Sequence, residues 1–187
     1  MPFALVVSLL LLQSVAPAEP SVRVHTLRIQ LLSTMLADSG VGEWGFAALV
    51  EADGKRFLVD TGARPSTVLE NAHELGIDLS GITDVILTHN HGDHTGGLLT
   101  IRRTLRAKNP AALSRAHVAP GIFWSRPGLK GESNPMLALR AQYVADGGQF
   151  IEHAKPKPLT PSLVAGEAAY LDSSSRIHRL YAVTAPV

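Results

Sequence analysis

The chain has 187 residues, long enough for one domain with a buried core, and 45% hydrophobic against 18% charged residues is typical of a globular protein. Its formal net charge of +1 lacks the excess positive charge expected of a protein that binds nucleic acid or an anionic membrane surface. The absence of cysteine excludes disulfides, thiolate ligands and a cysteine nucleophile, so any transition metal must be held by imidazole and carboxylate groups.

Residues 1–18 are predicted to be a signal peptide. Phe3–Leu12 is an apolar run too short to span a bilayer, and Ala16-Pro17-Ala18 is a small-x-small cleavage site. No lysine or arginine precedes the run, so a buried N-terminal strand is the alternative. Export without a lipid anchor predicts a periplasmic or secreted protein that has no membrane association after the signal is removed.

Alternating apolar residues predict strands in the first part of the chain. Residues Val22–Leu31 alternate in two runs, with a slip between Val24 and Leu27 that indicates a bulge. Two further apolar runs, Phe46–Glu51 and Arg56–Asp60, flank a segment that contains Asp-Gly. This pattern is a strong signal for a β-hairpin.

A helix is predicted over Thr67–Leu75. Thr67 and Glu70 form a capping box, and Gly76 stands where a left-handed C-terminal cap is needed. The spacing of the apolar residues predicts a buried stripe made of Val68, Leu69, Ala72 and Leu75.

A short buried strand is predicted at Val85–Leu87, because three consecutive apolar residues are typical of a strand covered on both faces. A polar loop, Thr88–Gly97, separates it from a helix over Leu98–Lys108 that Asn109-Pro110 would end. Basic residues become frequent between Arg102 and Arg126, and we interpret them as a solvated helix face.

The signals are weaker in the last third of the chain. Asn134-Pro135 is typical of a helix start, and Gly147-Gly148 would end that helix. Gln149–His153 is predicted to be a strand, whereas Lys155–Pro161 contains three prolines and cannot be a central strand. No internal repeat is found.

The loop after the buried strand carries the strongest chemical signal. His89, His91, Asp93 and His94 place three imidazoles and one carboxylate within six residues, at the end of a strand that would hold them in place. Imidazole and carboxylate are ligands that suit Zn²⁺, Mn²⁺ or Fe²⁺. We expect Gly92 to give the loop a turn that a Cβ would prevent, and Gly96-Gly97 to let the backbone pass close to the site.

This loop resembles the H-x-H-x-D-H signature of the metallo-β-lactamase superfamily, together with Thr88, Gly96-Gly97 and the upstream Asp60-Thr61-Gly62. The resemblance implies an α/β fold, an αββα sandwich of which this chain supplies mainly the N-terminal half. It implies a hydrolase that uses one or two metal ions, most simply zinc. Asp93 would be a ligand and would also orient the attacking water, while Asp60 would hydrogen-bond at the site without binding metal.

Several segments are similar in order and spacing to the dihydropterin ribofuranosylaminobenzene phosphate synthase-like branch. They are Gly42-Glu43-Trp44-Gly45-Phe46, Phe57-Leu58-Val59-Asp60-Thr61-Gly62, Asn71-Ala72, Leu75-Gly76-Ile77-Asp78-Leu79 and the loop Thr88–Gly97, which we name the metal loop. The similarity is close over 42–97 and looser to about Ser162. We therefore expect a partial domain over residues 19–162 and an unplaced tail over 163–187, in which Ser173-Ser174-Ser175 and Ala185-Pro186-Val187 resemble a loose end.

The family implies two metal sites, one with His89 and His91 and one with Asp93 and His94, each completed by a later histidine and by a bridging aspartate. Only three histidines remain downstream, namely His117, His153 and His178, and none lies in a motif that resembles the later ligands. His117 is expected to line a pocket or the surface. The ligand count predicts a protein that is weakly active or inactive, as a truncated enzyme would be.

Other functions stay open at this point. A glyoxalase II-like thioesterase, a lactonase or a β-lactamase would share the same loop, so the loop does not separate them. A non-catalytic remnant, which folds partly or binds a metal weakly and turns nothing over, is the alternative from another class. We expect a small-molecule substrate, and the sequence does not indicate an oligomeric state.

Overall fold

The computed structural model describes residues 24–128, 131–155, 157–160, 163–171 and 177–184. The predicted signal peptide, Val22 in the first predicted strand, Ser173-Ser174-Ser175 and Ala185-Pro186-Val187 lie outside these residues, so the predictions made for them stay predictions. In the described part of the chain no helix is long and apolar enough to cross a membrane.

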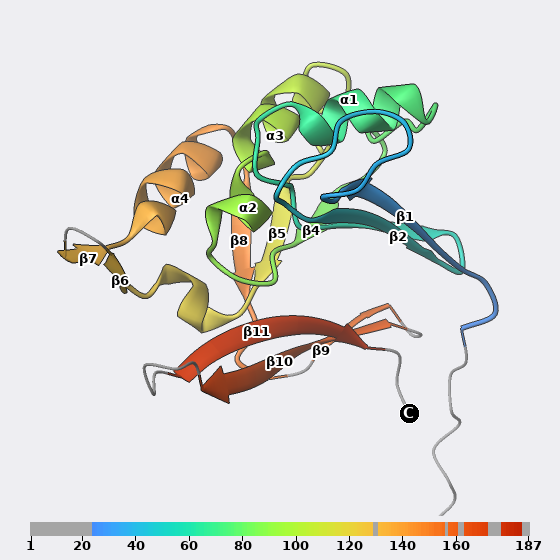
Figure 1. Cartoon of the computed structure of the whole chain (residues 1–187). Helices are drawn as coiled ribbons and strands as arrows, with labels where there is room; N and C mark the ends of the chain where they lie inside the picture. Colours follow the sequence, from blue (N-terminus) through green and yellow to red (C-terminus); the bar gives the residue numbers. More distant parts are fainter. Residues whose placement is uncertain (1–23, 129–130, 156, 161–162, 172–176, 185–187) are drawn as a thin grey trace, which may run out of the picture.

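The described residues form layers of helix, sheet and sheet (Figure 1). A six-stranded sheet has the strand order β1 (Leu27–Ser33), β2 (Ala47–Ala52), β3 (Lys55–Val59), β4 (Asp84–Ile86), β5 (Arg115–Val118) and β8 (Gln149–Glu152). A three-stranded sheet has the order β11 (Ile177–Thr184), β10 (Leu163–Leu171) and β9 (Lys157–Thr160). Helices α1 (Thr67–Glu74) and α3 (Leu98–Arg106) cover the face of the larger sheet that is turned away from the smaller sheet (Figure 1). The predicted α/β fold, with mainly the N-terminal half of an αββα sandwich, is confirmed.

The β-hairpin lies where the sequence predicts it. Strands β2 (Ala47–Ala52) and β3 (Lys55–Val59) pair antiparallel. The two residues between them have positive φ angles, 48° at Asp53 and 77° at Gly54, as a type I′ turn requires. This turn fixes the register that brings Asp60 to the end of β3.

Strand β1 (Leu27–Ser33) pairs with β2 and forms one edge of the larger sheet. Its register shifts between Leu31 and Ser33, so the irregularity lies at the C-terminal end of the strand rather than between Val24 and Leu27 as predicted. The shift turns both Leu32 and Ser33 into the interior, where Ser33 meets the loops described below.

Helix α1 (Thr67–Glu74) confirms the predicted position but not the predicted cap. Its N-cap is Ser66, which makes no side-chain capping bond. Thr67 is the first residue of the helix rather than its cap, and its hydroxyl donates to Glu43. Gly76 has the predicted positive φ, 66°. The buried stripe is rotated relative to the prediction: Asn71 is buried with Val68, while Leu75 is 47% exposed.

Strand β4 (Asp84–Ile86) is fully buried and pairs parallel with both β3 and β5 (Arg115–Val118), which the sequence signals did not reveal. Helix α3 (Leu98–Arg106) follows a short helix, α2 (Gly92–Thr95), inside the predicted loop. The interpretation of the basic residues as a solvated face is wrong for Arg102, which is 3% exposed. Its guanidinium donates to four backbone carbonyls, those of Pro110, Ala112, Asp146 and Gly147.

The last third contains the predicted helix and strand and additional strands. After a 3-10 turn, η1 (Pro120–Phe123), and a small hairpin of β6 (Arg126–Gly128) and β7 (Gly131–Ser133), helix α4 spans Pro135–Ala145. Its N-cap is Asn134, as predicted, and strand β8 (Gln149–Glu152) extends the larger sheet.

The segment after Ser162 is more regular than the sequence indicated. Strand β9 (Lys157–Thr160) is an edge strand, which agrees with the exclusion of this proline-rich segment from a central position. The backbone of β10 (Leu163–Leu171) pairs antiparallel with β9 and with β11 (Ile177–Thr184). Leu159 of β9 packs against apolar side chains of the larger sheet, so the two sheets share a small core.

Candidate metal centre

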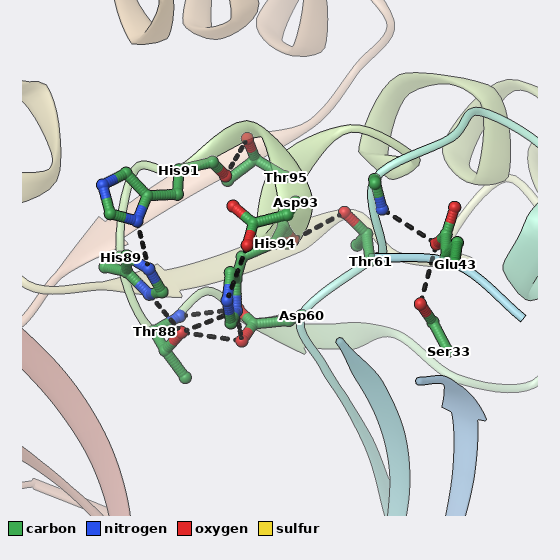
Figure 2. Close-up of polar contacts among 11 residues, drawn as sticks. Ser33, Glu43, Asp60, Thr61, Thr88, His89, His91, Asp93, His94 and Thr95 are labelled. Carbon is green, nitrogen blue, oxygen red and sulfur yellow. Dashed lines mark hydrogen bonds and ion pairs between the residues drawn. The ribbon is translucent and has the colours of Figure 1, made fainter. Parts of the chain in front are cut away.

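The polar loop lies at the edge of the sheet where the parallel strands β3 and β4 both end (Figure 2). Strand β3 leads directly into Asp60, and β4 leads into Thr88 and His89. Because parallel strands present their carboxyl ends at the same edge, residues far apart in the sequence meet there. Asp60 and His94 are joined by a hydrogen bond across a separation of 34 positions.

The four predicted ligands lie together on this loop, and the nitrogen and oxygen atoms that could bind a metal face one another in two pairs (Figure 2). His89 Nε2 is 2.9 Å from His91 Nδ1, and His94 Nε2 is 3.6 Å from Asp93 Oδ2. The rings of His89 and His94 are also adjacent, with centroids 4.0 Å apart. The side chains thus gather in one place, but as pairs rather than around a single point.

Asp60 holds one of these imidazoles from behind. Its carboxylate is 0% exposed and accepts from the Thr88 backbone N–H at 2.8 Å and from the Thr88 hydroxyl at 2.7 Å. Its Oδ2 lies 2.7 Å from His94 Nδ1. An Nδ1–H donated to this carboxylate leaves His94 Nε2 with the lone pair, which is the form that can bind a metal.

The pair of Asp60 and His94 favours an additional proton. Burial raises the pKa of Asp60, and hydrogen bonds from His94 and Thr88 oppose burial only in part. Burial alone would lower the pKa of His94, but the hydrogen bond to Asp60 and the charges of Asp60 and Asp93 outweigh it and raise that pKa. A cation that binds His94 would therefore compete with this proton.

The chemistry of the donors fits a transition metal, although neither pair is a complete site. Two nitrogen ligands of a tetrahedral zinc ion at 2.0–2.1 Å lie about 3.3 Å apart. The separation of 2.9 Å between His89 Nε2 and His91 Nδ1 needs a shift of only a few tenths of an ångström. Within the described ranges, however, no group of three His, Cys, Asp or Glu side chains is arranged to hold a metal ion.

Glu43 is the residue near this site whose role sequence reasoning missed. Its carboxylate accepts from the hydroxyls of Ser33 and Thr67 and from the backbone N–H groups of Ala63 and Arg64, at 2.7–3.0 Å. Burial alone would raise the pKa of Glu43, but these four bonds lower it, so the side chain is a buried carboxylate. The only sequence signal was its place in the branch-like segment Gly42–Phe46.

The glycines of the loop behave differently from one another. A Cβ on Gly96 would lie 2.0 Å from the carbonyl oxygen of Ala63, and one on Gly97 would lie 2.2 Å from that of Thr61. The predicted close backbone approach at Gly96-Gly97 is therefore confirmed. The prediction for Gly92 is wrong, because its φ is not positive and a Cβ there would meet nothing within 4 Å.

The downstream histidines with described side chains belong to a different cluster. His117 and His153 are buried and stack with ring centroids 5.3 Å apart, and His117 Nε2 lies 2.8 Å from Asp84 Oδ1. As predicted, His117 lines a pocket, of 590 Å³, but this pocket adjoins Asp84 at the start of β4, whereas the metal loop follows the end of that strand. The side chain of His178 lies outside the described part of the structure.

Comparison with known proteins supports the assignment of the loop to a family. Residues 45–160 match the family model of the metallo-beta-lactamase superfamily. Over 154 residues the chain is 30% identical to the 7,8-dihydropterin-6-methyl-4-(beta-D-ribofuranosyl)-aminobenzene-5'-phosphate synthase of Methanocaldococcus jannaschii, covering 75% of this chain and 50% of that protein. It is also 36% identical over 72 residues to ribonuclease Z of Mycobacterium avium, covering 38% of this chain and 25% of that protein.

Solved structures agree on the fold. A diphosphatase of the PhnP family matches with a TM-score of 0.55 and 16% identity, covering 86% of this chain and 63% of that one. The metallo-beta-lactamase fold protein YhfI from Bacillus subtilis matches with a TM-score of 0.56 and 12% identity, covering 84% and 57%. The chain spans half of the synthase and about a quarter of the ribonuclease.

Proposed function

The chain belongs to the metallo-beta-lactamase superfamily, and from this membership we propose that it is the metal-binding part of a metal-dependent hydrolase, with zinc as the simplest metal and manganese or iron as alternatives. The observation that carries the proposal is the pairing of donors on one loop: His89 with His91, and Asp93 with His94. Members of this family are hydrolases, and a strand-end loop of imidazoles and a carboxylate suits activation of water.

In this proposal each side chain has a distinct task. His89 and His91 would hold one metal ion, and Asp93 and His94 a second, with Asp60 fixing the ring of His94. A bound metal would supply a water molecule whose pKa is lowered to about 7 and a charge that polarises the substrate. Asp93, kept anionic by that charge, would orient the water and accept its proton.

The proposal includes weak activity or none. Catalytic zinc usually has three protein ligands and one open position, and each donor pair has two. Among described residues no third ligand joins either pair, and His117 and His153 are bonded to each other, at 3.0 Å. We therefore expect measurable metal binding without efficient turnover.

The substrate and the location are also proposals. We infer a small-molecule substrate and no nucleic-acid binding from the net charge of +1. The likeness to a ribonuclease Z makes RNA the alternative to test. Residues 1–18 support export to the periplasm or the medium. The likeness to a dihydropterin synthase-like protein favours that branch over a thioesterase, lactonase or β-lactamase.

The test is a zinc titration of the protein by calorimetry, with His91→Ala as the variant and His73→Ala as the matched control. His73 lies on α1 and lines two surface hollows that contain none of the four proposed ligands, so its removal should leave binding unchanged. Loss of His91 should weaken binding by at least tenfold, because it removes one of two donors from its pair. Equal affinities in all three proteins would contradict the metal assignment.

Turnover is measured on phosphodiester, thioester, lactone, β-lactam and RNA substrates with added Zn²⁺ or Mn²⁺. We expect no turnover above that of His91→Ala. Metal-dependent turnover that disappears in this variant would show that the chain completes its own site, and the substrate that reacts would identify the branch. Absence of turnover together with weak or absent metal binding would support a non-catalytic remnant.

A further inference from the structure

We propose that Glu43 is the positioning residue of the metal loop. Its buried carboxylate fixes the turn after Asp60, residues 61–64, and this turn fixes the backbone around His94. The inference rests on the proposed metal site for its functional meaning. Its structural content does not, because the contacts lie within the protein. Glu43 is 5% exposed and belongs to the segment that precedes β2.

Glu43 holds the turn through hydrogen bonds to its backbone. Oε1 accepts from Ala63 N–H at 2.9 Å and Oε2 from Arg64 N–H at 2.9 Å, so the two oxygens hold two consecutive backbone groups. The hydroxyls of Ser33 at 2.7 Å and Thr67 at 3.0 Å occupy the remaining directions. All four donors are neutral, and the carboxylate links β1, the turn and the first residue of α1.

The turn is itself hydrogen-bonded to the backbone of the metal loop. The N–H of Thr61 donates to the carbonyl of His94 at 2.8 Å, and the hydroxyl of Thr61 donates to the same carbonyl at 3.0 Å. The N–H of Gly96 donates to the carbonyl of Gly62 at 2.9 Å. The backbone groups on both sides of Thr95 are thus bonded to Thr61 and Gly62, which directly precede the pair held by Glu43. Figure 2 shows the contact between Thr61 and His94.

Two glycines give independent evidence that the packing is built around this carboxylate. A Cβ on Gly62, whose φ is 73°, would lie 2.4 Å from Glu43 Oε1. A Cβ on Gly45 would lie 3.0 Å from the same oxygen and 3.1 Å from the carbonyl oxygen of Asp93. Gly45 therefore lies between Glu43 and the metal loop, where any side chain would separate them.

The consequence concerns the orientation of the ligands. In each proposed pair, the separation of the two ligand atoms differs by a few tenths of an ångström from the separation that a shared metal ion would require. A metal site tolerates little more than that. If Glu43 loses its hold on Ala63 and Arg64, the turn can move, and the loop that carries Asp93 and His94 can move with it. Metal affinity should then fall although no ligand has been removed.

The first experiment measures hydrogen exchange in the metal-free protein, comparing Glu43→Gln with Asn71→Asp. Each change is made at a buried side chain that bonds to backbone groups. Glu43→Gln replaces a carboxylate with an amide, and Asn71→Asp replaces an amide with a carboxylate. Asn71 bonds to Leu32 and Val41 and not to the turn. We expect exchange at the amides of Thr61 and Gly96 to accelerate at least tenfold in Glu43→Gln, and to change no more than at other core amides in Asn71→Asp.

Thr67→Val provides a second variant if Glu43→Gln does not fold. It removes one of the four bonds to the carboxylate and nearly preserves side-chain shape, so the same two amides should show a smaller acceleration. Unchanged protection of Thr61 and Gly96 in folded Glu43→Gln, or in Thr67→Val when Glu43→Gln is unfolded, would overturn the proposal.

The second experiment measures Zn²⁺ affinity by competition with a chelator. We expect a loss of about 10–100-fold in Glu43→Gln and no change in Asn71→Asp. If the wild-type protein does not bind Zn²⁺ but the exchange result holds, the proposed metal function fails while the positioning role stands. If the wild-type protein binds and folded Glu43→Gln binds equally well, the positioning role is overturned and the metal function stands.

Discussion

An aspartate and a histidine are hydrogen-bonded at each end of the central strand β4, and the two pairs differ in charge. At the start of the strand Asp84 bonds to His117 and also to the guanidinium of Arg115, at 2.7 Å and 2.5 Å. After its end, where the metal loop begins, Asp60 bonds to His94 and to Thr88. The same two side-chain types therefore occur once with a permanent cation and once with neutral donors.

The pKa values follow this difference. Burial alone would raise the pKa of Asp84, but the bonds from His117, Arg115 and Thr83 hold it well below its usual range. Burial of Asp60 raises its pKa, and its hydrogen bonds do not reverse that effect. The carboxylate of Asp84 thus has a permanently charged partner, whereas that of Asp60 accepts from the neutral groups of Thr88 and from His94.

Removing the carboxylate of Asp60 is the strongest way to break this comparison. Asp60→Ala should lower the free energy of unfolding by about 3–5 kcal/mol, because it leaves the buried donors of Thr88 and His94 without their acceptor. Urea denaturation measures the loss. Asp60→Asn, which keeps one acceptor oxygen, should lose less, and a loss below about 1 kcal/mol in Asp60→Ala would show that the carboxylate charge and hydrogen bonds matter little.

A matched pair of glycine substitutions tests how closely the loop is packed. Gly96→Ala should cost about 1–3 kcal/mol, because its Cβ would lie 2.0 Å from the backbone oxygen of Ala63 and the backbone must move. Gly92→Ala meets nothing within 4 Å and should change stability by less than about 0.5 kcal/mol. Thermal unfolding of both variants gives the comparison. A Gly92→Ala loss as large as that of Gly96→Ala would refute the packing described for this loop.

The contribution of Asp84 to the free energy of unfolding should depend on pH in the acid range. Because the folded-state pKa of Asp84 is lowered, its contribution to stability is present above the unfolded value of about 3.9 and is lost as pH falls through the folded value. Unfolding measured between pH 5 and pH 2 should therefore show a shallower loss of stability for Asp84→Asn than for the wild-type protein. Parallel curves would mean that Asp84 gains nothing from Arg115 and His117.

The sequence predicted the elements whose signals are local. The Asp-Gly turn, Gly76, the buried strand before the metal loop and the Asn134-Pro135 helix start each depend on neighbouring residues, and each is found in the structure. The gathering of His89, His91, Asp93 and His94 on one loop could also be predicted, because a strand end and six consecutive residues restrict them. Their role as ligands stays a prediction.

Features that depend on distant partners could not be predicted in this way. Arg102 is basic and was assigned to solvent, but carbonyls from two later segments surround it. Thr67 has the pattern of a cap, yet a carboxylate 24 positions earlier takes its hydroxyl. Glu43 itself lies in a loop without periodicity, so nothing local indicates four hydrogen bonds. The strands β5, β10 and β11 carried no turn signals strong enough to mark their bounds.

The hydrogen bond between Asp60 and His94 also constrains how the protein can fold. The β2–β3 hairpin is local and can form within microseconds, and it delivers Asp60 to the end of β3. Parallel pairing of β3 with β4 must wait until α1 and its connections close a much longer loop. We therefore expect the site to assemble after the crossover, and a nascent chain cannot complete the Asp60–His94 contact until residue 94 has left the ribosome.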